Sequence, residues 1–324
     1  MTANASGAGR SAGFALLGFA GIAWGGMLPL GKVLFHHLDP VVMTALRYGA
    51  AALLFLAALA WREGRRALRL QGRGARLWLL GTIGFAGFNL LGFEGLQRTQ
   101  PEQAAVMVAL MPLVTALVQW ALYAQRPARA TWGAIGLALL GVLLVLGGGS
   151  TARLLHGGDV RGDLLVLAGA LCWVTYTLGA RAFPGWSPLR YTALSCGFGA
   201  ISIVGIAVAG MASGHLPVPD TADLRASAWG LAYLVLIAAF VAVLGWNAGI
   251  ARVGATAGVL FINLVPVTAF AVGACMGRHF GSAELLGAAL VMSALVINSV
   301  FAALGARSVR RARKPEALAA CPAR

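Results

Sequence analysis

Arg47 is a basic residue inside a long apolar stretch of the sequence, residues 41–61. Thr44 and Tyr48 lie on either side of it, one helical turn apart, so a helix brings the three polar side chains together. A guanidinium group offers a planar fork of donors that matches a carboxylate or a phosphate. We interpret these residues as candidates for substrate binding. The alternatives are that Arg47 extends to a polar surface or pairs with Glu94.

Glu94 is the acidic residue closest to the interior of another apolar stretch, residues 77–97. A carboxylate in such a place can take up and release protons, which makes Glu94 a candidate proton-coupling residue. Arg98 follows four positions later, and the alternative is an ion pair within one helix. Lys32 and Glu102 lie at the same boundary of the apolar stretches, and we expect both side chains to be solvated.

Two tryptophans, Trp24 and Trp173, lie well inside apolar stretches rather than at their ends. With Tyr176 they are candidates to line a cavity and to contact a bound molecule. The alternative is that the tryptophans pack between helices, while Tyr176 and Asn89 form hydrogen bonds from one helix to another.

Pro29, Pro112 and Pro266 interrupt apolar stretches, and Asn263 precedes the last of them. A proline within a helix removes one hydrogen bond and leaves a carbonyl without its partner. Each proline is therefore a candidate hinge, and Asn263 is a candidate substrate-binding residue beside one of them. The alternative is that the prolines are kinks of the kind that membrane helices tolerate.

The sequence contains no signature of a zinc protease, a serine hydrolase, a P-loop nucleotidase or a dinucleotide-binding enzyme. His36 and His37 precede Asp39 without further ligands nearby, so no metal site is predicted. We predict no catalytic residue and no cofactor. The alternative is a membrane-embedded enzyme for a lipid-linked or hydrophobic substrate, which would need acidic or histidine residues clustered in one cavity.

The elements that position these residues follow from the composition. Of the 324 residues, 59% are apolar and 11% are charged, whereas about a quarter are charged in a soluble domain. The apolar residues fall in blocks near or above the roughly 20 residues that cross a bilayer core. We predict an all-α integral membrane protein with ten transmembrane helices, near residues 13–35, 41–61, 77–97, 103–123, 131–149, 163–183, 188–212, 227–250, 256–277 and 284–305.

The net charge of +15 comes from 25 Lys and Arg residues, most of them in short linkers and at the C-terminus. With ten spans, eighteen fall on the side of the N-terminus, six on the other side, and Arg47 within a span. Because cytoplasmic loops are enriched in Lys and Arg, we place both termini in the cytoplasm. We predict no nucleic-acid partner. The expected partners are a small-molecule substrate and membrane lipid.

The two halves of the sequence share a residue pattern. At an offset of 149, Ala23-Trp24 corresponds to Cys172-Trp173, and at 148, Asp39-Pro40 corresponds to Ser187-Pro188. At 154, four residues recur: Gly95, Arg98, Pro112 and Gly133 correspond to Gly249, Arg252, Pro266 and Gly287. Each half holds five predicted helices, an odd number, so the second half must enter the membrane upside down. Such inverted-topology repeats are common among secondary transporters.

Two stretches resemble the EamA repeat of the drug/metabolite transporter superfamily. The first runs from Gly95 to Gly141 and includes Leu96-Gln97-Arg98-Thr99 and Met111-Pro112-Leu113. The second, more specific stretch runs from Trp246-Asn247-Ala248-Gly249 through Arg252-Val253-Gly254 to Asn263-Leu264-Val265-Pro266-Val267. Family members often carry Leu-Gly-Glu at the ends of helices 4 and 9, where this chain has Tyr123-Ala124-Gln125 and Gly277-Arg278-His279.

The resemblance implies a ten-helix exporter or permease with a central cavity between its halves. We expect a permease of the cytoplasmic membrane that moves small metabolites, amino acids or related compounds, by alternating access and in the direction of export. The expected segments are a cytoplasmic N-terminus, a first EamA repeat, a periplasmic linker, a second EamA repeat and a basic cytoplasmic tail, at residues 1–12, 13–149, 150–162, 163–305 and 306–324.

Overall fold

The computed structural model describes residues 7–147, 160–254 and 258–319, which form helices without any β-strand among them. In the first half, a π-helix, η2, joins α3 to α4 without a break. The elements are α1 (Gly7–Leu34), α2 (Pro40–Glu63), η1 (Arg65–Leu68), α3 (Gly74–Gly81), η2 (Thr82–Gly87), α4 (Phe88–Arg98), α5 (Pro101–Ala109), α6 (Met111–Tyr123) and α7 (Arg129–Gly147).

The second half has a similar series of long helices, and a second π-helix, η4, joins α11 to α12. Its elements are α9 (Val160–Gly179), η3 (Ala180–Ala182), α10 (Pro188–Ala212), α11 (Thr221–Ala232), η4 (Tyr233–Val241), α12 (Ala242–Val253), η5 (Val259–Asn263), α14 (Leu264–Cys275) and α15 (Ser282–Ala319). The all-α prediction is therefore confirmed for the described residues.

Among the described residues, eight helices are long and apolar enough to cross a membrane. The pair α5 and α6, bent by 41° where the two helices meet, would make a ninth span. A shorter apolar helix, Phe261–Cys275, covers most of the ninth predicted block. Length and apolar composition thus give eight or nine spans, and the count of ten stays a prediction.

The starts of α2 and α10 explain one part of the repeated sequence pattern. Asp39 caps α2, because its Oδ1 accepts a hydrogen bond from the Val41 amide at 2.8 Å, and Pro40 occupies the first position of the helix. Ser187 caps α10 in the same way, with its Oγ accepting from the Arg190 amide at 2.9 Å. A capping side chain followed by proline is a favoured helix start, and here it begins the second helix of each half.

Glycines let corresponding helices approach in both halves. A Cβ atom on Gly95 of α4 would lie 2.5 Å from the carbonyl oxygen of Gly162 on α9. A Cβ atom on Gly249 of α12 would lie 3.0 Å from the carbonyl oxygen of Gly13 on α1. These pairs are repeat mates at offsets of 154 and 149. The halves therefore pack against each other through the same contact, made twice.

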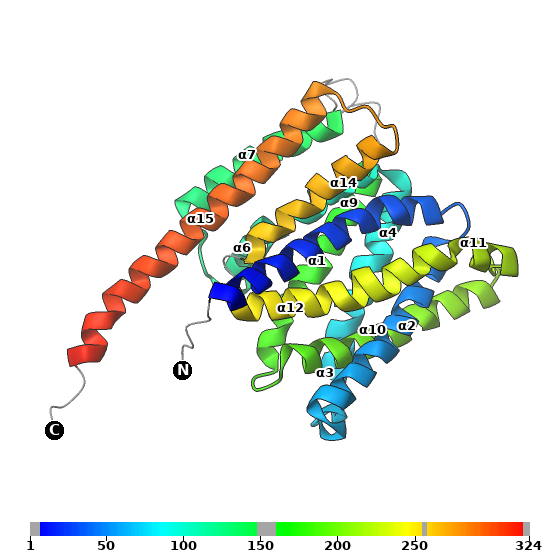
Figure 1. Cartoon of the computed structure of the whole chain (residues 1–324), viewed down its shortest axis with the longest axis horizontal. Helices are drawn as coiled ribbons and strands as arrows, with labels where there is room; N and C mark the ends of the chain where they lie inside the picture. The colour runs from blue at the N-terminus through cyan, green and yellow to red at the C-terminus, as the bar shows by residue number, and fades with distance from the viewer. Residues whose placement is uncertain (1–6, 148–159, 255–257, 320–324) are drawn as a thin grey trace.

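The last helices of the two halves, α7 and α15, lie side by side and run in opposite directions (Figure 1). A Cβ atom on Gly141 would lie 2.6 Å from the carbonyl oxygen of Gly287, and one on Gly287 would lie 2.5 Å from that of Gly141. Figure 1 also shows the start of α1 and the last turns of α15 at the same end of the molecule.

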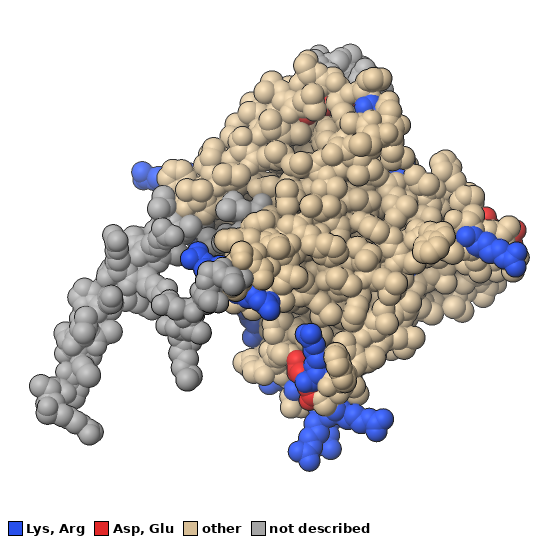
Figure 2. Space-filling view, in the orientation of Figure 1, with Lys and Arg blue, Asp and Glu red and all other residues tan. Residues whose placement is uncertain are grey.

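Large apolar side chains face outward over the helices. Trp229 is 88% exposed, Trp61 84% and Leu53 70%. In Figure 2 the Lys and Arg side chains lie toward the edges of the visible face, and the broad area between them holds few charges. A soluble protein rarely exposes so large an apolar surface, whereas a lipid bilayer covers it.

Candidate functional site

A cavity of about 100 Å³ lies between the two halves. Because one water molecule needs roughly 10–15 Å³ of such space, the cavity can hold several water molecules. Apolar side chains make up most of its wall, together with a few polar groups. The lining residues are Trp24, Met27, Leu28, Arg47, Tyr48, Phe88, Asn89, Gly92, Phe93, Ala104, Val108, Met111, Val166, Trp173, Ala238, Val243, Ile262 and Val265.

Arg47 is held in this wall with only 2% of its surface exposed. Its Nε donates a hydrogen bond to the Leu234 carbonyl at 3.3 Å, and its Nη1 donates to Oδ1 of Asn89 at 3.3 Å. The guanidinium carbon lies 4.8 Å from the ring centre of Tyr48 and 5.8 Å from that of Phe93. Both distances allow a cation–π interaction. The side chain is therefore turned into the protein and does not reach a polar surface.

No carboxylate within the described part of the chain forms an ion pair with Arg47. Asp39, on the same helix, is engaged as the cap of α2. A buried cation normally has an anionic partner or several hydrogen bonds, because its desolvation is costly. Among the residues that the structure describes, the charge of Arg47 is thus offset by two oxygen acceptors and two aromatic faces.

The two π-helices supply backbone acceptors at the cavity. Leu234 and Ala238 belong to η4, and their carbonyl oxygens accept from Arg47 Nε and from Trp24 Nε1, the latter at 2.9 Å. In the other half, Asn89 Nδ2 donates to the carbonyl oxygen of Phe85, in η2, at 2.9 Å. A π-helix shifts the helical hydrogen bonds to i→i+5, and such segments are frequent at functional sites.

The aromatic candidates are divided between the cavity and the packing around it. Trp24, Trp173 and Tyr48 line the cavity. Trp173 also contacts Phe88 with ring centres 5.3 Å apart. Tyr176 does not line it: its hydroxyl lies 3.0 Å from Ser195 Oγ, and its ring stacks on Tyr191 at 4.9 Å.

Thr44 and Asn263 lie outside the cavity lining. The Thr44 hydroxyl donates to the carbonyl oxygen of Pro40, one turn back in the same helix, at 2.6 Å. The Oδ1 atom of Asn263 is buried and has no hydrogen-bond partner within the described ranges; it belongs to the residue after Ile262, which does line the cavity. The binding roles of Thr44, Tyr176 and Asn263 stay predictions.

Glu94 is likewise outside the cavity lining. Its side chain is 39% exposed and its Oε1 lies 3.0 Å from Nη2 of Arg98, one helical turn along α4. This is the intrahelical ion pair that the spacing offered as an alternative. The structure does not bring Glu94 to Arg47, and proton coupling through Glu94 stays a prediction.

The three candidate hinges differ in their surroundings. Pro29 lies inside the continuous helix α1. Pro112 lies at the start of α6, just after the 41° bend. Pro266 lies in the first turn of α14, just after η5. Pro112 and Pro266 are repeat mates, so each half has an interrupted helix at the same place.

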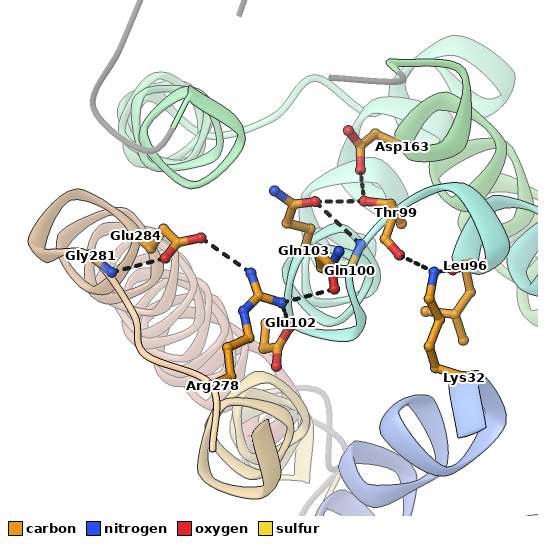
Figure 3. Close-up of polar contacts among 10 residues, drawn as sticks. All are labelled: Lys32, Leu96, Thr99, Gln100, Glu102, Gln103, Asp163, Arg278, Gly281 and Glu284. Carbon is orange, nitrogen blue, oxygen red and sulfur yellow. Dashed lines mark hydrogen bonds and ion pairs between the residues drawn. The ribbon is translucent and has the colours of Figure 1, made fainter. Parts of the chain in front are cut away.

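Figure 3 shows a polar network around Arg278. Arg278 contacts Glu102 and lies 3.3 Å from Oε1 of Glu284. Its Nη1 also donates to Gln100 Oε1 at 3.2 Å. Glu102 is 3% exposed, so the expectation that its side chain is solvated is wrong. Burial beside Arg278 is possible because the guanidinium neutralises the carboxylate.

Figure 3 shows a second set of polar contacts beside this network. Lys32 Nζ donates to the carbonyl oxygens of Leu96, Gln97 and Thr99 at 2.7 to 2.8 Å, where it caps the C-terminal end of α4. The Thr99 hydroxyl donates to Asp163 of α9 at 2.7 Å. The polar contacts in Figure 3 therefore connect α1, α4, α5, α9 and α15.

The order of residues along each helix separates this network from the cavity. On α1 the lining residues Trp24 to Leu28 precede Lys32, and on α4 the lining residues Phe88 to Phe93 precede Leu96. On α5 the lining residue Ala104 follows Glu102. The network therefore lies beyond the cavity on each of these helices.

Comparison with known proteins gives consistent results. The model of the EamA-like transporter family matches residues 11–147 and 160–300. The chain is 30% identical to the uncharacterized transporter YrdR of Bacillus subtilis, over 87% of this chain and 89% of that protein. It is 31% identical to the uncharacterized transporter YyaM of the same organism, over 86% and 90%. One crystal structure shares the fold with a TM-score of 0.63 at 23% identity, covering 90% of this chain and 98% of its own.

Proposed function

Since this chain belongs to the EamA-like transporter family and is a multi-pass membrane protein, we propose that it exports small metabolites by alternating access. The substrate class is amino acids and related compounds, and the membrane is the cytoplasmic membrane. The observation that carries the proposal is the cavity between the two repeats, with a buried cation in its wall and a polar network beyond it on one side. Alternating access requires such a central site, with closure on one side at a time.

The proposed topology is ten spans in two inverted repeats. The glycine contact that recurs between α4 and α9 and between α12 and α1 supports it. The antiparallel course of α7 and α15 supports it as well, because the last helices of two inverted five-helix repeats run in opposite directions.

Both termini are proposed to lie in the cytoplasm. The start of α1 and the last turns of α15 lie at one end of the molecule, which is consistent with an even number of spans. The arginine-rich segment 62–76 begins in the last turn of α2. This end of α2 lies on the same side of the molecule as the start of α1. Six arginines in one short loop are costly to translocate.

The network of Arg278, Glu102 and Glu284 is the proposed outer closure of the cavity. It joins α5 of the first half to the connection before α15 and to the start of α15 in the second half. Contacts that bridge two moving parts can hold one state closed and be released in the other. The alternative function, a membrane-embedded enzyme, has less support, because no acidic or histidine side chain is among the described residues of the lining.

An export assay with a blocked cavity tests this function. Gly92 lines the cavity, and a Cβ atom there meets nothing within 4 Å, so a larger side chain can enter the space. Cells that produce the protein should release a set of small metabolites that cells without it retain, and Gly92→Trp should abolish this release. Gly136→Trp is the matched control, because Gly136 lies on the exposed face of α7 with equal room. Equal release with Gly92→Trp at equal folded yield would contradict the proposal.

A further inference from the structure

The guanidinium group of Arg47 has more donors than the protein uses. An arginine carries five N–H groups, and the contacts of Arg47 occupy one on Nε and one on Nη1. Nη2 has no hydrogen-bond partner among the described residues, nor is it sealed away from the space around it. The two Nη atoms together form the edge that binds a carboxylate through two parallel hydrogen bonds. A buried, charged fork with free donors thus lies in the cavity wall.

Arg47 is the one charged side chain among the described lining residues of the cavity. A positively charged group of a bound molecule would therefore find no carboxylate in the wall. Three acidic residues lie on helices that contribute to the cavity wall, and each has a partner elsewhere: Glu94 with Arg98, Glu102 with Arg278 and Asp163 with Thr99. Asn263 Oδ1, which has no hydrogen-bond partner among the described residues, lies outside the lining, and two backbone oxygens at the cavity already accept hydrogen bonds. The carbonyl oxygens of Leu234 and Ala238 already accept from Arg47 and Trp24.

An ammonium group in this cavity would lose its hydration without gaining an ionic partner, and burying an unpaired charge is costly. A dianion such as a phosphate ester would bring one more negative charge than Arg47 can neutralise. The remaining wall is apolar and aromatic, with Trp24 and Trp173 among its residues. Such a wall fits the apolar body of a solute.

We propose that the cavity binds monocarboxylates with an apolar or aromatic body and no free ammonium group, with Arg47 holding the carboxylate. This inference rests on the proposed transport function. It narrows the expected substrates from amino acids to related acids whose amino group is absent or blocked.

The test uses purified full-length protein in lipid nanodiscs and an equimolar set of matched compounds. Each apolar body is present in three forms: the carboxylic acid, the corresponding α-amino acid and the corresponding amine. Compounds retained by the protein are separated from free compounds and quantified by mass spectrometry. Wild-type protein should retain carboxylic acids at least about tenfold over both partners, because the amine lacks the carboxylate that pairs with Arg47 and the amino acid would bury an ammonium group without an ionic partner.

Three variants identify the group responsible. Arg47→Gln should lose the preference for carboxylic acids, and Arg47→Lys should weaken it, because lysine keeps the charge without the fork. Asn89→Asp should also abolish it, because a carboxylate placed where Asn89 now accepts from Arg47 occupies the guanidinium. Asn89→Asp leaves Arg47 in place, so it remains informative if Arg47→Gln does not fold. Arg225→Gln, on an exposed part of α11, is the control and should behave as wild type.

Equal retention of amino acids or amines, an unchanged preference in Asn89→Asp, or no retention of carboxylic acids by the wild type would each overturn the inference. These outcomes are distinguishable from a failure of the transport function. A protein that retains amino acids independently of Arg47, and whose export is blocked by Gly92→Trp, would still be an exporter.

Discussion

Glu94 and Arg47 are the two charged residues that the sequence made candidates for function, and the structure places them in different surroundings. Arg47 is buried in the cavity wall without an acidic partner among the described residues. Glu94 is partly exposed and pairs with Arg98. The physical difference is that a guanidinium can be held by carbonyl oxygens and aromatic faces, whereas a carboxylate needs donors, which Arg98 supplies to Glu94 one turn along the same helix.

Proton coupling can be tested at Glu94 directly. If Glu94 carries the coupled proton, Glu94→Gln abolishes the response of export to a pH gradient while leaving the folded yield unchanged, because the side chain is partly exposed. The measurement is export from cells or proteoliposomes with and without an imposed gradient. The control is Arg98→Gln, which removes the ion pair but keeps the carboxylate. If export by Glu94→Gln still responds to the pH gradient, Glu94 is not the coupling residue and its role is the ion pair with Arg98.

The helices depend on close approach at glycine, which gives a matched test on α7. A Cβ atom on Gly141 would lie 2.6 Å from the carbonyl oxygen of Gly287, so Gly141→Ala should push α7 and α15 apart. We expect a loss of about 1–3 kcal/mol in stability, as for other overpacked sites. Gly136→Ala on the same helix meets nothing within 4 Å and should be neutral or slightly stabilising. The measurement is thermal unfolding in detergent. Equal unfolding temperatures for the two variants would contradict the packing account.

Part of this arrangement of helices could be predicted from the sequence. The offsets of 149 and 154 predicted two related halves, and the glycine contacts between α4 and α9 and between α12 and α1 join residues at those offsets. The two π-helices were not anticipated. Their residues, Thr82–Gly87 and Tyr233–Val241, are apolar or small like the rest of each span, so their composition carries no signal for the shifted hydrogen bonds.

The pairing of Glu102 with Arg278 could not be predicted from the sequence either, because the two residues lie 176 positions apart. The available signal was the departure from the family pattern at Gly277-Arg278-His279, where family members often carry an acidic residue. An arginine at that position fits with a carboxylate buried on a neighbouring helix. For the cavity, the sequence placed Arg47, Tyr48, Trp24 and Trp173 among the candidates, and these residues do line it.

At the scale of the whole molecule, the central claim is that the cavity between the halves opens alternately to the two sides of the membrane. A reporter cysteine in the cavity can test this in protein whose native cysteines, Cys172, Cys196, Cys275 and Cys321, have been replaced. Gly92→Cys is suited to the purpose, because it lines the cavity and has room for a side chain. Ala222→Cys, at the exposed start of α11, serves as the reference for the outer side.

The decisive measurement is the rate at which an impermeant thiol reagent labels Gly92→Cys in intact cells, with and without the network beyond the cavity. The double change Glu102→Gln with Arg278→Gln removes the ion pair, and Glu284, which loses its contact with Arg278, keeps the hydrogen bond from the Gly281 amide at 3.0 Å. We predict slow labelling from outside with the network intact, faster labelling in the double variant, and equal labelling of Ala222→Cys in both. Labelling of Gly92→Cys at the same rate in both backgrounds would contradict the account of an outer closure over a transport cavity.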